Sequence, residues 1–541
     1  MNHTLIAKKV DVRGRVFRKI CRRMAKFHGG LSASQNHGDP IMSGIDGSFD
    51  IGKIDAGSRL YNADLAPVTR DERTWNWVSI SALWVSMVVC LPAFYAASAL
   101  ISEGLSAKQA ILTIFLGNLI ILVPMILVGH AGTKYGIPFA VLLRSSFGVN
   151  GAKLPVLFRG MVACFWFGIQ VWIGGSAIYV VLNSLSGDWF IGDRLPLLDI
   201  DLAQFLCFLA FWLMHIWLIT KGTESLRILE TYAAPVLILI CIALLIWAYR
   251  SADGFGTLLA APSQFVPGGA KEGQFSAVFW AGLTASVGGW STLALNIPDF
   301  TRMARSQKDQ IVGQALGLPV PMVLLAFVAV SVTSATVIIF GEAIWDPIQL
   351  ASRLGGGAVI GALIALILAT LTTNMAANVV APSFGFSALA PSKISLRSGG
   401  YITAVIGVII MPWKLLESSS ALIQWLVGIA VLLGPIAGIV LADYYLIRKA
   451  QLDIAGLYQS QGPYSYTGGW NIAAVVAFGL ALFVNLPGFL ASVGIVLPVP
   501  DLLIELYQYA WFVGTAITII SYTLLMRLEI FGQYSILKQQ R

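Results

Sequence analysis

Charged residues are scarce in this chain. They make up only 11% of its 541 residues, whereas 57% are hydrophobic, and the mean hydropathy is +0.78. A soluble globular domain carries about a quarter charged residues. The composition therefore excludes that class and indicates a polytopic membrane protein.

Cysteine and histidine are also few, with five of each. Cys21 lies near the amino terminus and the other four cysteines lie in apolar stretches, with no spacing typical of a metal site. We interpret them as packing residues. The sequence contains no phosphate-binding loop and no nucleophile elbow, and His215 has no evident catalytic partner. We therefore expect neither an enzyme nor a bound cofactor.

Apolar windows long enough to cross a membrane recur along the whole chain. About 20 such residues form one transmembrane helix. We predict an all-α polytopic membrane protein with twelve transmembrane helices, the ninth being the shortest. The predicted spans cover residues 77–101, 109–129, 155–183, 203–220, 231–249, 275–298, 315–340, 358–380, 400–413, 418–447, 470–495 and 502–526. Two prolines within residues 381–398 make a re-entrant turn conceivable there.

Lysine and arginine are distributed unevenly between the two sides of this topology. Cytoplasmic loops retain basic residues, and with a cytoplasmic amino terminus only six of the 35 lie in outer loops: Lys108, Arg194, Arg250, Lys271, Arg353 and Lys414. We predict that both termini are cytoplasmic and that the protein lies in the cell membrane, plasma or inner. The net charge of +8 then reflects topology rather than a nucleic-acid partner.

Residues 1–73 form a basic tail before the first span. The first 38 residues contain nine basic side chains and one acid, Asp11. Three interpretations are open: a disordered cytoplasmic arm, a basic helix on the membrane surface, or a targeting peptide. We expect the disordered arm.

A run of hydroxyls and carboxamides interrupts the eighth span at residues 369–378. Thr370, Thr373, Asn374 and Asn378 share one helix face because positions three, four and eight apart lie above one another. Small polar residues can simply hold two helices together. Five polar residues within nine positions favour a binding site instead.

Two spans carry signals for a broken helix. Pro92 removes a backbone donor in the first span, and Gly288 and Gly289 weaken the sixth. Transporters built from inverted repeats break the matching helices of each repeat. We predict five-helix repeats at residues 74–250 and 274–447. A cytoplasmic loop at 448–469, two peripheral helices at 470–526 and a cytoplasmic tail at 527–541 follow.

A second polar cluster lies in the third span, where Trp166 and Gln170 are four residues apart and share a face. Trp290 stands next to the glycines of the sixth span. Two indoles can hold a flat heterocycle by stacking, and carboxamides such as Gln170 and Asn378 offer a donor and an acceptor to its edge. We predict a neutral planar ligand with a polar rim. A core-filling role for Trp166 is the alternative.

The nature of the coupling ion follows from an absence. Spans one, three, six and eight have no Asp or Glu at mid-depth, where proton relays normally use them. Sodium suits neutral oxygens, and Thr372, Thr373, the Ala369 carbonyl and carbonyls freed near Pro92 can supply them. We expect sodium rather than protons.

Proton coupling nevertheless remains open, because two carboxylates lie close to spans. Glu230 begins the fifth span and Asp299 ends the sixth. Structural pairing with Arg227 or Arg302 is the simpler interpretation of both.

Several stretches together resemble the nucleobase:cation symporter-1 family of cytosine, purine, uracil, thiamine and allantoin permeases. They span residues 58 to 450 and read Ser58-Arg-Leu-Tyr-Asn-Ala-Asp-Leu-Ala-Pro67, Glu72-Arg-Thr-Trp75, Lys134-Tyr-Gly-Ile-Pro-Phe139, Arg144-Ser-Ser-Phe-Gly148, Trp166-Phe-Gly-Ile-Gln170, Asn296-Ile-Pro-Asp-Phe-Thr-Arg302 and Thr373-Asn-Met-Ala-Ala-Asn378. The family includes a bacterial hydantoin transporter with a LeuT-type fold. The resemblance implies a 5+5 inverted repeat with two peripheral helices.

The resemblance also implies roles for individual residues. Substrate-binding residues would be Trp166 and Trp290 on the ring faces, Gln170 and Asn378 on its edge, and Gly289 where the ring approaches the backbone. Sodium ligands would be Ala369, Thr372 and Thr373, together with backbone carbonyls between Val88 and Leu91. The sequence Leu91-Pro-Ala-Phe-Tyr95 lacks the polar residue that family members commonly have there, which leaves the substrate open.

These observations together predict a secondary active transporter. We expect a monomer that imports a nucleobase or related ring, such as uracil, cytosine, a purine, allantoin or a hydantoin, by cation symport and alternating access. The alternatives are a proton-coupled carrier of another small polar solute, such as an amino acid, or a passive channel.

Overall fold

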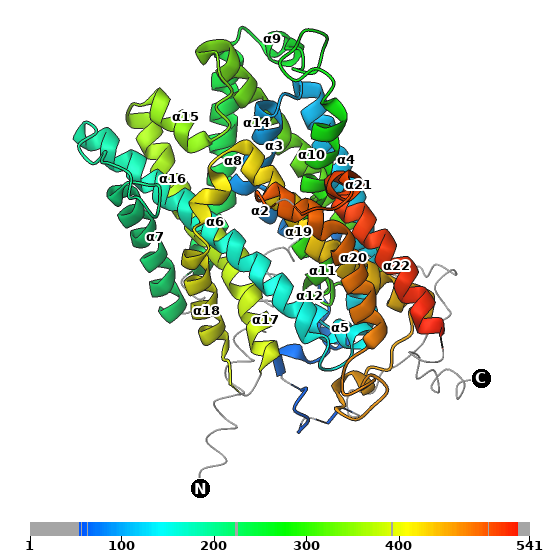
Figure 1. The fold of residues 1–541 in the computed structure, drawn as a ribbon. Helices are drawn as coiled ribbons and strands as arrows, with labels where there is room; N and C mark the ends of the chain where they lie inside the picture. The colour runs from blue at the N-terminus through cyan, green and yellow to red at the C-terminus, as the bar shows by residue number, and fades with distance from the viewer. Residues whose placement is uncertain are drawn as a thin grey trace, which may run out of the picture.

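Helices form nearly the whole of the described chain (Figure 1). The computed structural model describes residues 54–528, apart from 56, 62, 222–225, 391–392 and 496. Within that part, strand pairing is limited to isolated bridges such as Trp75 with Ala304. Most of the predicted basic tail and the end of the carboxy-terminal tail lie outside the described residues.

The long helices fall at the predicted spans, and short helices lie between them. The first half contains α2 (Trp77–Val88), α3 (Leu91–Ser102), α4 (Ala107–Tyr135), α5 (Phe139–Phe147), α6 (Lys153–Ser186), α7 (Leu202–Lys221), α8 (Leu226–Ser251) and α9 (Phe255–Ala260). The second half contains α10 (Phe275–Gly289), α11 (Ser291–Asn296), α12 (Pro298–Thr301), α13 (Gln307–Gly317), α14 (Pro319–Phe340), α15 (Pro347–Leu354), α16 (Gly357–Asn374), α17 (Ala381–Leu389), α18 (Leu396–Ile409) and α19 (Ser419–Leu441). The last part contains α20 (Ile472–Ser492), α21 (Asp501–Glu505) and α22 (Ala510–Arg527).

Length and composition make most of these helices candidates for membrane crossing. Among the described residues, nine helices are long and apolar enough, and the bent pair α2 and α3 makes a tenth. Two shorter apolar helices, the Pro235–Ser251 part of α8 and all of α18, stand where spans five and nine are predicted. The structure is therefore consistent with twelve spans.

The predicted bounds need correction at two places. The seventh span begins earlier than predicted, because α13 continues into α14 and the two cover Gln307–Phe340. The re-entrant turn considered at residues 381–398 is not found in the described part of that range, which forms α17 and the start of α18. Residues 381–389 continue the eighth span as α17, which follows the π-helical residues 375–380 without a break and contains Pro382.

Both predicted helix breaks occur. α2 and α3 meet at an angle of 60° around Val89 and Cys90, and Cys90 has the extended dihedral angles φ −143° and ψ 156°. Among the described residues, no backbone N–H reaches the carbonyls of Met87 and Val89. Pro92 has no N–H to offer to the Val88 carbonyl four residues before it, and this carbonyl accepts from the Cys90 N–H instead. α10 ends at Gly289 and α11 begins at Ser291.

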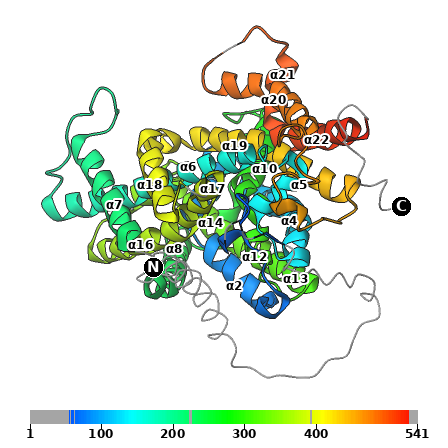
Figure 2. The ribbon, with the colours of Figure 1, turned by 90° about the horizontal axis from the view of Figure 1, so that it is seen from below.

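Two groups of helices meet around these breaks. In one group, α4 packs against α10, α13 and α14, and α2 packs against α13; in the other, α6 packs against α7, α16, α17 and α18. α19 packs against α10, and α20 and α22 pack against α19 at one edge of the molecule (Figure 2). Glycines allow close approach at these contacts. A Cβ on Gly313 would lie 2.6 Å from Cβ of Ile80, and one on Gly288 would lie 2.3 Å from the Leu426 carbonyl oxygen.

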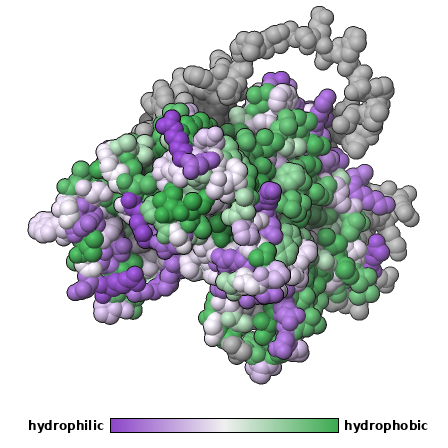
Figure 3. All heavy atoms as spheres, turned by 90° about the horizontal axis from the view of Figure 1, so that it is seen from above, coloured by the Kyte–Doolittle hydropathy of each residue, from purple (hydrophilic) through white to green (hydrophobic). Residues whose placement is uncertain are grey.

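The two ends of the described chain lie on the same side of the molecule. In Figure 1 the first described residues and the end of α22 lie opposite α9 and α15. An even number of membrane spans places both ends of a chain on the same side. Figure 3 looks onto the end that carries α9, where clusters of hydrophilic side chains stand among hydrophobic ones. Large apolar side chains are exposed along the flanks, as expected for lipid contact: Leu112, Leu119, Val123, Leu213, Trp217, Leu324, Ile409 and Phe483.

Candidate functional site

A cavity of about 110 Å³ lies between the two broken helices and α6. A single water needs roughly 10–15 Å³ of such space, so the cavity has room for a small ring. Its walls are mainly apolar with a few polar groups, as is usual for small-molecule sites. The lining residues include Met87, Cys90, Pro92, Ala93, Ala96, Arg159, Trp166, Gln170, Ser286, Gly289, Trp290, Thr292, Leu293, Met322, Asn378 and Leu426.

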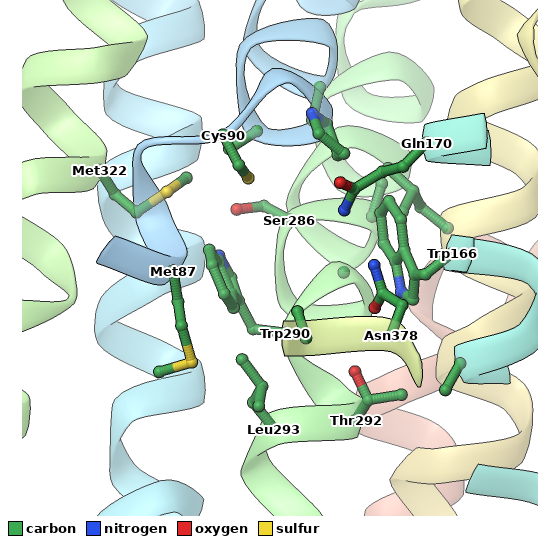
Figure 4. A pocket seen from close by; sticks show the side chains of 18 of the residues that line it. Met87, Cys90, Trp166, Gln170, Ser286, Trp290, Thr292, Leu293, Met322 and Asn378 are labelled. Carbon is green, nitrogen blue, oxygen red and sulfur yellow. The ribbon is translucent and has the colours of Figure 1, made fainter. Parts of the chain in front are cut away.

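All five residues predicted to bind substrate line this one cavity. Figure 4 shows the Trp166 and Trp290 side chains on opposite sides of it, with the Gln170 and Asn378 carboxamides on the Trp166 side. Gln170 and Asn378 are both buried in the protein. Gly289, at the end of α10, leaves its backbone open to the cavity. Residues from three separate spans thus converge on a single space.

A short π-helical segment determines where Asn378 lies. α16 ends at Asn374, and residues Met375–Val380 form a π-helix before α17 begins. Such insertions are common at functional sites because they rotate the following side chains relative to a regular α-helix. Asn378 therefore reaches the cavity wall beside Trp166.

Each of the two cavity indoles is supported by another indole that the sequence analysis did not select. Trp166 meets Trp425 of α19 with ring centroids 4.6 Å apart and planes at 76°. Trp290 meets Trp84 of α2 with centroids 5.7 Å apart and planes at 71°. Perpendicular aromatic pairs of this kind are favourable. The position of Trp84 deep within an apolar span is a signal that could have identified it, whereas Trp425 near the start of α19 resembles an ordinary interfacial tryptophan.

Two more polar residues of the cavity were missed. Arg159 is buried and lines the cavity, and its Nε atom has no hydrogen-bond partner among the described residues. Arg159, Ala163, Trp166 and Gln170 follow one face of α6, so helical spacing could have included it. Ser286 also lines the cavity, and its buried hydroxyl has no partner in the described part of the chain.

Asn374 and His215 have partners that the sequence did not reveal. The Asn374 carboxamide donates across to the Phe167 carbonyl of α6 at 3.1 Å and lies 3.1 Å from Nε2 of His215 in α7. Asn374 therefore joins α16 to α6 and α7, in the manner expected for a polar residue that holds helices together. His215, which the sequence left without a partner, belongs to this contact.

The predicted sodium ligands of the eighth span lie within hydrogen-bonding distance of one another. The hydroxyls of Thr372 and Thr373 each donate to the Ala369 carbonyl at 2.9 Å. Ala369 packs in a small cluster with Val89 and Leu237, so the α2–α3 break lies next to it. The predicted Val88 carbonyl already accepts from the Cys90 N–H at 2.8 Å.

Asp299 and Glu230 are the two carboxylates considered as proton carriers. Asp299 accepts from the Phe139 N–H at 2.8 Å and from Nδ2 of Asn296 at 3.4 Å, and Arg302 donates to its main-chain carbonyl. These contacts give Asp299 a structural role between α12 and α5. The side chain of Glu230 lies outside the described residues.

The family model for permeases for cytosine/purines, uracil, thiamine and allantoin matches residues 67–514. This chain belongs to that permease family. The match confirms the resemblance drawn from the sequence motifs, and the members of this family are permeases rather than enzymes.

Relatives of this permease extend over most of the chain. It is 43% identical over 497 residues to the purine-uracil permease NCS1 of Arabidopsis thaliana, covering 90% of this chain and 82% of that one. It is 38% identical over 477 residues to the allantoin permease of Bacillus subtilis, covering 87% and 94%.

Solved structures show the fold. The inward-facing conformation of Mhp1 matches the permease with a TM-score of 0.71 at 23% identity, covering 90% of this chain and 98% of that one. Mhp1 in a closed conformation with bromovinylhydantoin bound matches with a TM-score of 0.67 at 24% identity, covering 88% and 98%. Mhp1 is a nucleobase-cation-symport-1 family transporter. The predicted fold class, an all-α polytopic membrane protein, is thereby confirmed, and the predicted twelve helices with a 5+5 inverted repeat and two peripheral helices are consistent with it.

Proposed function

We propose that the permease imports a neutral planar ring with an amide or ureide edge, together with a sodium ion, by alternating access. The observation that carries this proposal is the convergence of Trp166, Gln170, Gly289, Trp290 and Asn378 on one cavity between the two helix breaks. Substrate sites of inverted-repeat transporters lie at such breaks.

The chemistry of the cavity favours a ring over an amino acid. The indoles of Trp166 and Trp290 offer apolar faces to a flat heterocycle, and each ring–indole pair contributes about 0.5–1.5 kcal/mol beyond its buried area. The two carboxamides offer hydrogen bonds to its edge. An amino acid instead needs a helix amino terminus directed at its carboxylate.

The names of the relatives support the same class of substrate. They include a purine-uracil permease, allantoin permeases, and the uridine and uracil permeases of Saccharomyces cerevisiae. Uracil, allantoin and purines are our first candidates. Cytosine and hydantoins share the same edge chemistry and follow them.

We propose sodium as the coupling ion, held between α16 and the α2–α3 break. The oxygens of Ala369, Thr372 and Thr373 are grouped on one side, and the Val88 and Leu91 carbonyls belong to the break that faces them. A bound cation would hold α2 and α3 in the arrangement that completes the wall around the ring. By linkage, the ring must raise the affinity for the cation by the same factor.

We also propose a membrane, an oligomeric state and an orientation for the permease. We place it in the cell membrane as a monomer, with both termini in the cytoplasm, because basic residues are concentrated on the side of the termini. Import then moves the ring and the cation from the side of α9 and α15 to the side of α5.

Uptake by cells that express the permease tests this function. Labelled uracil, allantoin and leucine are supplied at equal concentration, with and without a sodium gradient and at two external pH values. We expect saturable, sodium-dependent uptake of at least one ring and none of leucine. Uptake driven only by a pH gradient would replace sodium by protons, and uptake that does not saturate would indicate a channel.

A further inference from the structure

Asn378 lies at the cavity and is the first residue of a hydrogen-bonded chain that leads from the cavity into the protein. Its Nδ2 atom donates to Oδ1 of Asn374 at 3.0 Å. Asn374 in turn uses Nδ2 toward both the Phe167 carbonyl and Nε2 of His215, each at 3.1 Å. Nδ1 of His215 lies 2.9 Å from the Phe211 carbonyl. Three spans thus contribute to the chain.

Two backbone carbonyls determine the direction of every hydrogen bond in it. A carbonyl oxygen can only accept, so the proton of His215 must be on Nδ1, facing Phe211. The neutral imidazole then offers Nε2 as an acceptor. The Phe167 carbonyl likewise requires the NH₂ group of Asn374, whose second N–H meets Nε2 of His215. A reversed Asn374 amide would place two acceptors against each other.

The orientation of Asn378 follows from these directions. Oδ1 of Asn374 can only accept, so the group that faces it must be the NH₂ of Asn378. The hydrogen bond that Asn378 makes among the described residues uses its NH₂ group, which leaves its oxygen unbonded there, and Asn378 lines the cavity. The oxygen is therefore the atom available to a ligand.

Gln170 differs from Asn378 in this respect. Its carboxamide is buried at the cavity wall and forms no hydrogen bond with any described residue. Gln170 can turn either its oxygen or its NH₂ group toward a ligand. One carboxamide of the pair is thus fixed by the protein, and the other can adapt.

Burial and the neighbouring aromatic rings keep this hydrogen-bonded chain from rearranging. Asn374 and His215 are fully buried. The His215 ring lies nearly perpendicular to the rings of Phe167 and Phe211, with centroids 5.2 and 4.8 Å away. Turning any amide over would leave a buried polar group unpaired, which is unfavourable without water.

We propose that His215 and Asn374 are positioning residues that fix the Asn378 carboxamide with its oxygen toward the cavity, so that the substrate must present a ring N–H at that point. This inference rests on the proposed function and narrows it. The substrate class becomes rings with an N–H donor at one defined edge position, and Gln170 accepts either a donor or an acceptor beside it. N-methylation at the defined position removes the donor and blocks the contact.

The test compares rings that differ only in that hydrogen. Dissociation constants of purified permease for hydantoin, uracil and their two mono-N-methyl isomers are measured by quenching of tryptophan fluorescence. We expect the wild type to prefer one parent ring over one of its methyl isomers by about tenfold or more, because a site built to bond an N–H rejects a ligand without it. The other isomer should be affected less.

Three variants then test the hydrogen-bonded chain from Asn378 to His215. Asn374→Leu removes the acceptor that holds Asn378, and the preference should fall to about threefold or less because the amide can turn. His215→Leu should lower the preference partly. His215→Gln, whose oxygen can accept from Asn374, should restore it. Asn485→Leu is the matched control, since Asn485 is a fully buried asparagine whose one hydrogen bond to a described residue goes to the Ala481 carbonyl in its own helix.

The outcomes separate this inference from the proposed function. If the wild type binds none of the rings, the proposed function is wrong. If it binds them, but Asn374→Leu and His215→Leu keep the wild-type preference, the positioning role is wrong. Should Asn374→Leu fail to fold, the contrast between His215→Leu and His215→Gln decides, because a merely structural role would change stability without changing the preference.

Discussion

The Trp166 indole rests against the Trp425 indole, with ring centroids 4.6 Å apart and planes at 76°. Trp166 belongs to α6 and Trp425 to α19, so a contact between distant parts of the chain holds one face of the cavity. The opposite face has the same design, with Trp290 against Trp84. Affinity for a ring should therefore depend on residues that do not touch it.

Replacing Trp425 tests this dependence. We expect Trp425→Leu to weaken ring binding about twofold to tenfold, because an aromatic pair contributes about 0.5–1.5 kcal/mol and tenfold corresponds to about 1.4 kcal/mol. Trp425→Phe should retain most of the affinity. Isothermal titration with the best-bound ring measures both. Equal affinity of Trp425→Leu and wild type would contradict a supporting role.

Two adjacent glycines provide a matched pair that separates folding from binding. A Cβ on Gly288 would lie 2.3 Å from the Leu426 carbonyl oxygen, whereas the nearest contact of one on Gly289 is an ordinary 3.6 Å from Leu426 Cδ2. We expect Gly288→Ala to lower the thermal unfolding midpoint because α10 must move away from α19. Gly289→Ala should keep the midpoint and lose ring affinity. Midpoints and dissociation constants that change together in both variants would refute this division.

The sequence predicted these features unequally. The spans and both breaks followed from composition, Pro92 and the paired glycines, because lipid imposes strict rules on helix length and backbone pairing. The residues around the cavity followed from helical spacing in single spans, such as Trp166 with Gln170. Helical spacing shows which side chains share a face of one helix, but it does not show which other helix that face contacts.

Contacts between helices account for what was missed. Trp425 and His215 gain their roles from partners more than 150 residues away in the chain. The π-helical segment Met375–Val380 has no reliable local signal, so the sequence did not reveal how Asn378 is turned toward the cavity. Pro382 misled in the opposite direction, because a proline usually ends or kinks a helix, whereas here the helix continues past it as α17.

The hydroxyls of the eighth span give a prediction about sodium. We expect Thr372→Val and Thr373→Val each to raise the sodium concentration that half-saturates ring binding by about tenfold, which corresponds to loss of one oxygen ligand worth about 1.4 kcal/mol. Thr370→Val is the control, because Thr370 is buried like Thr372 but lies outside the predicted ligand set. Fluorescence titration with sodium at fixed ring concentration is the measurement. An unchanged sodium dependence in both variants would rule out these ligands.

A hydrogen bond between α3 and the start of α15 gives a prediction about stability alone. The Tyr95 hydroxyl of α3 donates to the Asp346 carboxylate at 2.5 Å, and Asp346 caps α15 through the N–H groups of Ile348 and Gln349. Tyr95→Phe should destabilise the protein by about 1.5–3 kcal/mol, the range for hydrogen bonds to charged groups, and should leave ring affinity unchanged. Tyr249→Phe, at an exposed tyrosine, should change neither. Thermal unfolding of wild type, Tyr95→Phe and Tyr249→Phe, measured with and without the bound ring, makes this comparison.

Transport in proteoliposomes tests the central claim most directly. Purified permease is reconstituted, an inward sodium gradient is imposed, and accumulation of the best-bound labelled ring is followed for wild type and Asn378→Ala. The account predicts accumulation above equilibrium that collapses when the sodium gradient is removed and is absent in a folded Asn378→Ala variant. Accumulation by Asn378→Ala at the wild-type rate, or equal accumulation without any sodium gradient, would contradict it.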